Sequence, residues 1–149
     1  MILKDICVLT VATCGRETSV LEAARLMRQH HTGTLIVVDD PGGERSPAGI
    51  VTDRDIVVQV LADELDPGTT PVARIMASRL VVASASESLA EAVERMRRHG
   101  VRRLPVIEGN GGLLGIVTLD DLIALHAAQA AALAAIVSKE QDHEQRTRR

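Results

Sequence analysis

Aromatic residues are absent: none of the 149 residues is Phe, Tyr or Trp. Single-stranded nucleic acids are usually bound on aromatic stacking platforms, so their absence disfavours that class of ligand. The formal net charge of −3 disfavours nucleic acid in general, because phosphate neutralisation requires a basic surface. The core must be built from Val, Ile, Leu, Ala and Met, and a planar ligand would have to lie between aliphatic side chains.

Cysteine is also scarce. Cys7 and Cys14 are the two cysteines, and they form neither a disulfide framework nor a zinc-ligand spacing. We interpret both as small buried hydrophobes. No apolar run approaches the roughly 18 residues that would span a membrane. The N-terminus lacks the basic-then-apolar layout of a secretory signal. We therefore expect a cytoplasmic protein without a membrane partner.

An internal repeat is the main feature that the chain does contain. The octapeptide Gly49–Ile56 (GIVTDRDI) returns as Gly115–Leu122 (GIVTLDDL). Each copy predicts a strand that runs into a helix, with a threonine and a carboxylate at the junction. Two such junctions in one short chain indicate a duplicated ligand-binding unit.

The duplication extends upstream of the octapeptides. Apolar residues at i, i+3, i+4 and i+7 predict helices over 20–27 and, 69 positions later, over 89–96. Ser19-x-x-Glu22 and Ser88-x-x-Glu91 predict capped starts for both. Short strands are predicted at 34–39, 48–51, 103–108 and 113–117, with weaker extended segments at 8–13 and 80–84.

The predicted fold class is therefore α/β (α+β), with two tandem β-α-β-β-α units that pack through their sheets because neither half has enough apolar surface to stand alone. The predicted boundaries are 4–62 for the first unit, 63–74 for the linker, 75–130 for the second unit and 131–149 for an extension. The extension continues an Ala-rich helix that begins near Thr118. This helix either caps its own domain or contacts a partner or a second copy. The charged segment 139–149 is predicted to fray.

The capped helices with their Ala/Met stripe, the segment Arg102–Ile107 (RRLPVI) and the two Gly-Ile-Val-Thr-x-x-Asp motifs together resemble a tandem CBS domain pair over roughly residues 4 to 130. The chain is similar to the free-standing bacterial kind. The resemblance implies a pseudo-two-fold axis between the units and clefts between their sheets. It also implies adenosine-containing ligands such as AMP, ADP, ATP or S-adenosylmethionine, and flat dimers that act as regulatory modules.

The Thr-x-x-Asp junctions admit two interpretations. As structure, Thr52 and Asp55 would cap a helix and oppose its dipole. As function, the resemblance implies that Asp55 accepts both ribose hydroxyls while Thr52 approaches the ribose-phosphate. Helix N-termini also attract phosphate. Thr118 and Asp121 are the equivalents in the second unit.

Phosphate ligands are expected from basic residues. Arg54 precedes Asp55, whereas Asp120 precedes Asp121, so the first junction is predicted to suit a phosphate better. The resemblance implies that Arg102 and Arg103 reach phosphates across the pseudo-two-fold axis. The alternative is a solvated arginine cluster with Arg95, Arg97 and Arg98.

The adenine is expected to lie between aliphatic strand residues, each of which is otherwise a core residue. The candidates are Val11, Ala12, Leu35, Ile36 and Ile50 in the first unit, and Val82, Ala83, Leu104, Pro105 and Ile116 in the second.

The other titratable groups predict neither catalysis nor metal binding. His30 and His31 are adjacent at a helix end and point in different directions, so we expect them to be solvated. The aspartates of the two junctions lack a nearby nucleophile or base, so we predict no catalytic residue, no metal and no required cofactor. The predicted function is a non-enzymatic adenine-nucleotide sensor that forms a homodimer. The alternative is a protein-interaction scaffold with vestigial ligand sites and an unidentified protein partner.

Overall fold

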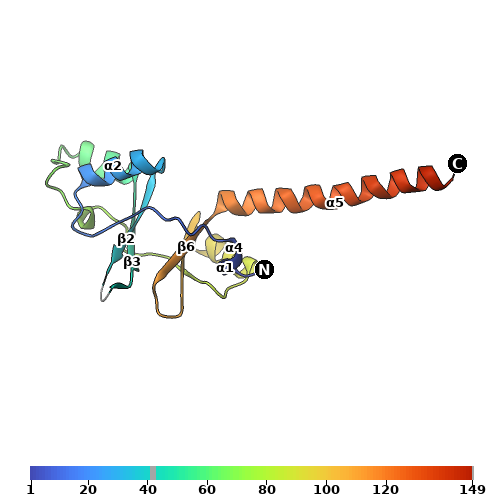
Figure 1. Ribbon diagram of the computed structural model, residues 1–149. Coiled ribbons are helices and arrows are strands. Elements are labelled where there is room, and N and C mark those ends of the chain that lie inside the picture. Colours follow the sequence, from blue (N-terminus) through green and yellow to red (C-terminus); the bar gives the residue numbers. More distant parts are fainter. Residues whose placement is uncertain (41–42, 149) are drawn as a thin grey trace. The chain divides into compact units, whose positions relative to one another are not determined.

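The chain divides into two compact units, Met1–Val117 and Thr118–Arg149. The computed structural model describes residues 1–40 and 43–148. The first unit contains two three-stranded sheets, with the strand orders β1-β2-β3 and β4-β5-β6 (Figure 1). Each sheet belongs to one copy of the repeat, so the predicted α/β class with two repeated units is confirmed.

The elements of the first repeat follow the predicted order, except that the chain begins with a short helix that the sequence pattern did not predict. They are α1 (Leu3–Ile6), β1 (Thr13–Cys14), α2 (Val20–His30), β2 (Thr34–Asp39), β3 (Ser46–Thr52) and α3 (Asp53–Ile56), which continues as a π-helix over Val57–Leu61. The second repeat contains β4 (Ala83–Ser84), α4 (Leu89–His99), β5 (Arg103–Ile107) and β6 (Leu113–Thr118), and a 3₁₀ helix (Val72–Arg74) precedes it. The weaker extended segments thus become strands of two residues each.

The two long helices of the repeats begin and end in the same way. Ser19 accepts a hydrogen bond from the amide of Glu22, and Ser88 and Glu91 form a complete capping box. Both helices end at a residue in the left-handed region, where His31 has φ 52° and Gly100 has φ 63°. The predicted capping box is therefore confirmed at Ser88 and Glu91, whereas Ser19 caps α2 through the single bond from Glu22.

The strand register gives the exact correspondence between the repeats. In the first sheet β1 pairs in parallel with β2, and Cys14 lies opposite Val37. In the second sheet Ala83 lies opposite Val106. Both positions differ by 69, the same spacing as the helices. Under this spacing, residues 8–13 correspond to 77–82. The segments 8–13 and 80–84, which the sequence pattern predicts as equivalent, are therefore offset by two to three residues. Short strands with little apolar periodicity do not determine their own register.

In each repeat, the last strand also pairs with a segment of the other repeat. Val8 forms an antiparallel bridge with Ile116 of β6, and Ala77 forms one with Ile50 of β3. The two bridges correspond to each other, since 8 and 77 differ by 69. The glycines of the octapeptides allow the crossing, because a Cβ on Gly115 would lie 2.7 Å from the carbonyl oxygen of Val8. On Gly49 it would lie 2.8 Å from the carbonyl oxygen of Ala77.

The first repeat has a core made entirely of aliphatic and sulfur-containing side chains. Leu35, Val37 and Val51 are fully buried between the sheet and α2, and Cys14 is buried with them. Cys7 is only partly buried, so the prediction of a buried thiol is correct for Cys14 and wrong for Cys7.

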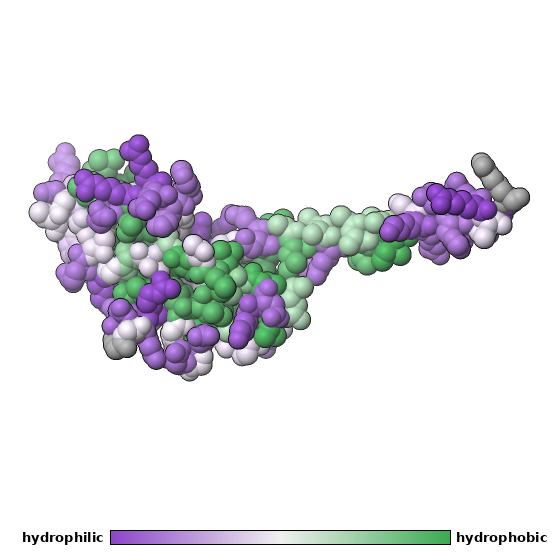
Figure 2. All heavy atoms as spheres, in the orientation of Figure 1, coloured by the Kyte–Doolittle hydropathy of each residue, from purple (hydrophilic) through white to green (hydrophobic). Residues whose placement is uncertain are grey.

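The second unit is one helix, α5 (Leu119–Thr147), of 29 residues. The charged segment after Lys139 is helical through Thr147 rather than frayed, because helix formers and pairs such as Glu144 and Arg148, 3.9 Å apart, continue the helix. An 18-residue window of α5 has a mean hydropathy of 1.6, so this helix is long and apolar enough to cross a membrane. By length and composition, α5 therefore contradicts the prediction that no apolar run approaches 18 residues. Green hydrophobic spheres give way to purple ones toward the C-terminal end of α5 (Figure 2).

Candidate functional site

A small cavity in the first repeat is lined by four of the predicted adenine residues. We call it the first cleft, and its volume is about 170 Å³. It is lined by Thr10, Val11, Ala12, His30, Thr32, Thr34, Ile36 and Ile116. Its lining therefore combines the segment before β1, the end of α2, β2, and one residue from β6 of the other repeat. A typical small-molecule site measures roughly 300–1,000 Å³, so the first cleft has room for one end of a ligand.

A larger cavity occupies the corresponding place in the second repeat. We call it the second cleft, and its volume is about 680 Å³. It is lined by Arg79, Leu80, Val81, Val82, Arg95, Arg98, His99 and Val101.

The 69-residue spacing relates the two cavities residue by residue. Arg79, Leu80 and Val81 correspond to Thr10, Val11 and Ala12, while His99 and Val101 correspond to His30 and Thr32. Five lining positions thus coincide under the spacing that the strand register defines. The fold has built the same cleft twice.

Four of the predicted adenine residues line the first cleft. They are Ile36 and Ile116, which have branched aliphatic side chains, and the neighbouring residues Val11 and Ala12. A cleft with this lining can hold a planar base between aliphatic side chains, as the absence of aromatic residues requires.

The other adenine candidates lie elsewhere. Val82 lines the second cleft. Leu35, Leu104, Ala83 and Pro105 are almost completely buried, so they belong to the core. Strand alternation turns the neighbours Leu104 and Pro105 to opposite faces of β5, so apolar character alone did not distinguish core positions from cleft positions. Ile50 is half-buried and bridges to Ala77.

Thr52 and Asp55 form a complete capping box at the start of α3. The Asp55 carboxylate oxygen Oδ2 accepts hydrogen bonds from the Thr52 amide at 2.9 Å and from the Thr52 hydroxyl at 3.0 Å. The Asp55 amide donates to the Thr52 hydroxyl at 3.2 Å. Asp55 Oδ1 has a longer contact of 3.4 Å with Gln59. Thr52 pairs in register with Thr34, so this junction lies one strand away from the lining of the first cleft.

Thr118 and Asp121 form the equivalent capping box at the start of α5. The Thr118 hydroxyl donates to Asp121 Oδ2 at 2.6 Å, and the Asp121 amide donates back to that hydroxyl at 3.2 Å. Both junctions therefore satisfy the structural interpretation, and a ligand role would use the remaining carboxylate oxygen.

The predicted phosphate residues are exposed. Arg54, Arg102 and Arg103 all have exposed side chains, and none of them lines either cleft. An acidic group lies instead beside Gly33, the residue before Thr34, because a Cβ on Gly33 would lie 2.6 Å from a carboxylate oxygen of Asp53. This carboxylate disfavours a phosphate beside Thr34.

Several cleft residues escaped the sequence analysis. His30, which the sequence predicts to be solvated, lines the first cleft while remaining exposed. His99, for which no role was predicted, lines the second cleft and is also exposed. Arg79 and Thr10 lie in weakly patterned segments. Their shared 69-residue spacing was a signal that could have identified them. Within the described residues, no three His, Cys, Asp or Glu side chains gather as metal ligands.

Comparisons with known proteins identify the family and the fold of this chain. The family model described as CBS domain matches twice, at residues 3–62 and 72–127. The CBS domain-containing protein YhcV of Bacillus subtilis is 40% identical over 119 residues, which cover 80% of this chain and 81% of YhcV. Hypoxic response protein 1 of Mycobacterium tuberculosis is 36% identical over 128 residues, 86% of each chain.

Solved structures show the same fold. A crystal structure of Hypoxic Response Protein I with two coordinated zinc ions has a TM-score of 0.72 and 36% identity, covering 85% of this chain and 98% of that one. The CBS domain pair of MJ0100, in complex with 5′-methylthioadenosine and S-adenosyl-L-methionine, has a TM-score of 0.73 and 26% identity. That match covers 87% of this chain and 98% of the MJ0100 chain.

Proposed function

Because the chain belongs to the CBS domain family and carries that domain twice, we propose that it is a regulatory module that binds an adenosine-containing ligand. The ligand would be an adenine nucleotide or a related adenosine derivative, held in the clefts of the two repeats. The CBS pair of MJ0100 binds 5′-methylthioadenosine and S-adenosyl-L-methionine, which supports the ligand class. The proposal includes no catalytic step and no cofactor.

The observation that carries the proposal is the lining of the first cleft by both repeats. Val11, Ala12 and Ile36 come from the first repeat, whereas Ile116 comes from the second. A base held among these side chains would contact both repeats at once. It would favour the arrangement of the repeats in which all the contacts are made, and that differential affinity is what a regulatory ligand requires.

Recognition of the ribose is assigned to Asp55. One of its oxygens caps α3, and the other would accept hydrogen bonds from the ribose hydroxyls. Charge-assisted hydrogen bonds contribute roughly 1.5–3 kcal/mol, so this carboxylate would account for about tenfold or more in affinity.

Calorimetric titration with adenosine, AMP, 5′-methylthioadenosine and S-adenosyl-L-methionine tests the proposal. We expect at least one of them to bind the wild-type protein, and Ala12→Leu to abolish the binding of uncharged adenosine by filling the first cleft. Ala128→Leu, which adds the same side chain at an exposed position of α5, should bind as the wild type does. Asp55→Asn keeps an acceptor for the cap and should weaken binding about tenfold. Absence of binding by all four compounds, or unchanged adenosine binding by Ala12→Leu, would show the proposal to be wrong.

A second candidate function is self-association through α5. The side chains of Leu133, Ile136 and Val137 are all more than half exposed, and an exposed apolar helix face commonly marks an interaction surface. This candidate corresponds to the predicted homodimer, and it is compatible with ligand binding in the clefts.

A further inference from the structure

The second cleft carries positive charge that its counterpart lacks. Arg79, Arg95 and Arg98 line it. The residues 69 positions earlier are Thr10, Leu26 and Gln29. None of these three is charged, although the fold around both clefts is the same. The second repeat therefore has three guanidinium groups around its cavity where the first repeat has uncharged residues.

Capping of the helix does not account for all of these cations. Basic residues in the last turn of a helix offset the negative end of its dipole. Both α2 and α4 have such residues, Arg28 and His30 in one and Arg97, Arg98 and His99 in the other. Arg79 belongs to a separate extended segment, and Arg95 precedes the last turn. Two of the three cations thus have no role at the helix end.

The acidic neighbours leave part of this charge available. Glu87 accepts two hydrogen bonds from Arg95, at 2.7 and 3.1 Å. Glu94 accepts two from Arg97, at 2.8 Å each, and hydrogen bonding by Arg97 lowers the pKa of the Glu94 carboxyl. Arg98 reaches Glu94 only at 3.8 Å.

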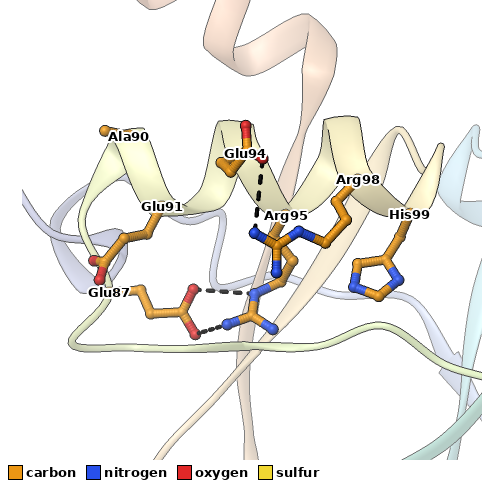
Figure 3. A pocket seen from close by; sticks show the side chains of 7 residues that line it. All are labelled: Glu87, Ala90, Glu91, Glu94, Arg95, Arg98 and His99. Atoms are coloured by element: carbon orange, nitrogen blue, oxygen red, sulfur yellow. Dashed lines mark hydrogen bonds and ion pairs between the residues drawn. The ribbon is translucent and has the colours of Figure 1, made fainter.

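Glu87 and Glu94 line a separate groove along α4, next to the second cleft (Figure 3). The groove and the second cleft share Arg95, Arg98 and His99. Within the residues that the structure describes, the side chains of Arg79 and His99 make no hydrogen bond or ion pair. Guanidinium groups match the geometry of phosphate, and the imidazole adds a donor.

We propose that the second cleft binds a phosphorylated ligand through Arg79, Arg98 and His99, whereas the first cleft holds an uncharged adenosine moiety. The cavity of about 680 Å³ falls within the roughly 300–1,000 Å³ of small-molecule sites. The first cleft is smaller and has the Asp53 carboxylate beside Gly33. The two clefts then select ligands by charge. This assignment rests on the proposed function only in that both clefts are ligand sites.

Inorganic pyrophosphate tests the assignment, because it carries the phosphate chemistry without the adenosine. In titrations followed by calorimetry and by amide NMR shifts at low ionic strength, we expect pyrophosphate to bind. The largest shifts should lie at 79–82 and 98–101. Arg79→Gln and Arg98→Gln should each weaken binding roughly tenfold or more. Arg97→Gln is the matched control, since Arg97 neighbours Arg98 on the same exposed helix turn but lies outside the cleft, and it should bind as the wild type does.

Three results would overturn the assignment: no binding of pyrophosphate, equal weakening by Arg97→Gln, or shifts centred on Arg102 and Arg103 instead. Arg79 and Arg98 lie on different segments, so misfolding of one variant leaves the other informative. Titration with adenosine separates this assignment from the proposed function. Adenosine binding at the first cleft without pyrophosphate binding would leave the proposed function intact and refute the second cleft.

Discussion

The two cysteines of this chain differ in burial, and Cys14 is the buried one. Its side chain is packed in the first core, whereas Cys7 is only partly buried. Burial in apolar surroundings disfavours the charged thiolate, and it raises the pKa of the Cys14 thiol from 9.0 to about 11. Cys14 therefore behaves as a small apolar side chain at neutral pH and is a poor nucleophile.

The stability of the protein should consequently depend on this thiol at alkaline pH. In the unfolded chain the thiol releases its proton near pH 9, while in the folded protein it keeps the proton until about pH 11. The unfolded state thus binds fewer protons in this range, and stability falls as the pH rises. Urea unfolding at pH 7, 9 and 10.5 should show a steeper loss of the free energy of unfolding for the wild type than for Cys14→Ala. Parallel pH profiles would contradict this expectation.

At the scale of elements, the exchanged segments connect the two repeats. The Val8 amide donates to the Ile116 carbonyl at 2.9 Å, and the Ile116 amide donates back at 3.0 Å. The same pair of bonds joins Ile50 and Ala77, at 3.0 and 2.9 Å. Both crossings pass directly over a glycine, so the glycine of each Gly-Ile-Val-Thr motif serves the contact between the repeats.

Gly115→Ala tests this role. Its Cβ would meet the Val8 carbonyl oxygen at 2.7 Å and the Cys7 sulfur at 2.9 Å. We expect it to lower the free energy of unfolding by about 1–3 kcal/mol, as overpacking generally does. Gly109→Ala is the matched control because nothing lies within 4 Å of its Cβ position, and it should change stability by no more than about 0.5 kcal/mol. Equal effects of the two substitutions in urea unfolding would remove the steric explanation.

At the scale of the whole molecule, the exposed apolar side chains of α5 predict a contact with a second copy of the chain. Leu133 lies fourteen residues from either end of the helix, Leu119–Thr147, and it is 66% exposed. The first turn contains Asp120 and Asp121, and the last contains Arg146. An antiparallel pair of α5 helices centred on Leu133 would bring these opposite charges together and oppose the two dipoles.

We therefore expect the protein to be a dimer by light scattering detected through refractive index. Leu133→Glu combined with Ile136→Glu should make it a monomer. Ala131→Glu provides the control, because residue 131 lies about 200° around the helix from residue 133, and this variant should remain a dimer. A monomeric wild type that sediments with phosphatidylcholine vesicles would instead identify α5 as a membrane segment, consistent with its hydropathy.

The sequence by itself determined the duplication, the type and order of the elements, and the helix starts. Each of these depends on local patterns: the apolar stripes, the serine caps and the Gly-Ile-Val-Thr octapeptides are contained within a few turns or one strand. The CBS resemblance followed from the same patterns, and the family comparison confirms it. Half of the first cleft's lining, Val11, Ala12, Ile36 and Ile116, was also predictable from them.

Only the tertiary structure decided which residues face a cavity. Leu104 and Ile116 are both aliphatic strand residues, yet Leu104 is buried in the core and Ile116 lines the cleft of the other repeat. Arg79 and Arg98 are 19 positions apart, and the packing of an extended segment beside the end of α4 brings them to one cavity. The exchange of segments also depends on pairings between residues far apart in the chain. Local patterns specify which side of a strand is apolar, and long-range packing specifies whether that side meets a core, a cleft or the other repeat.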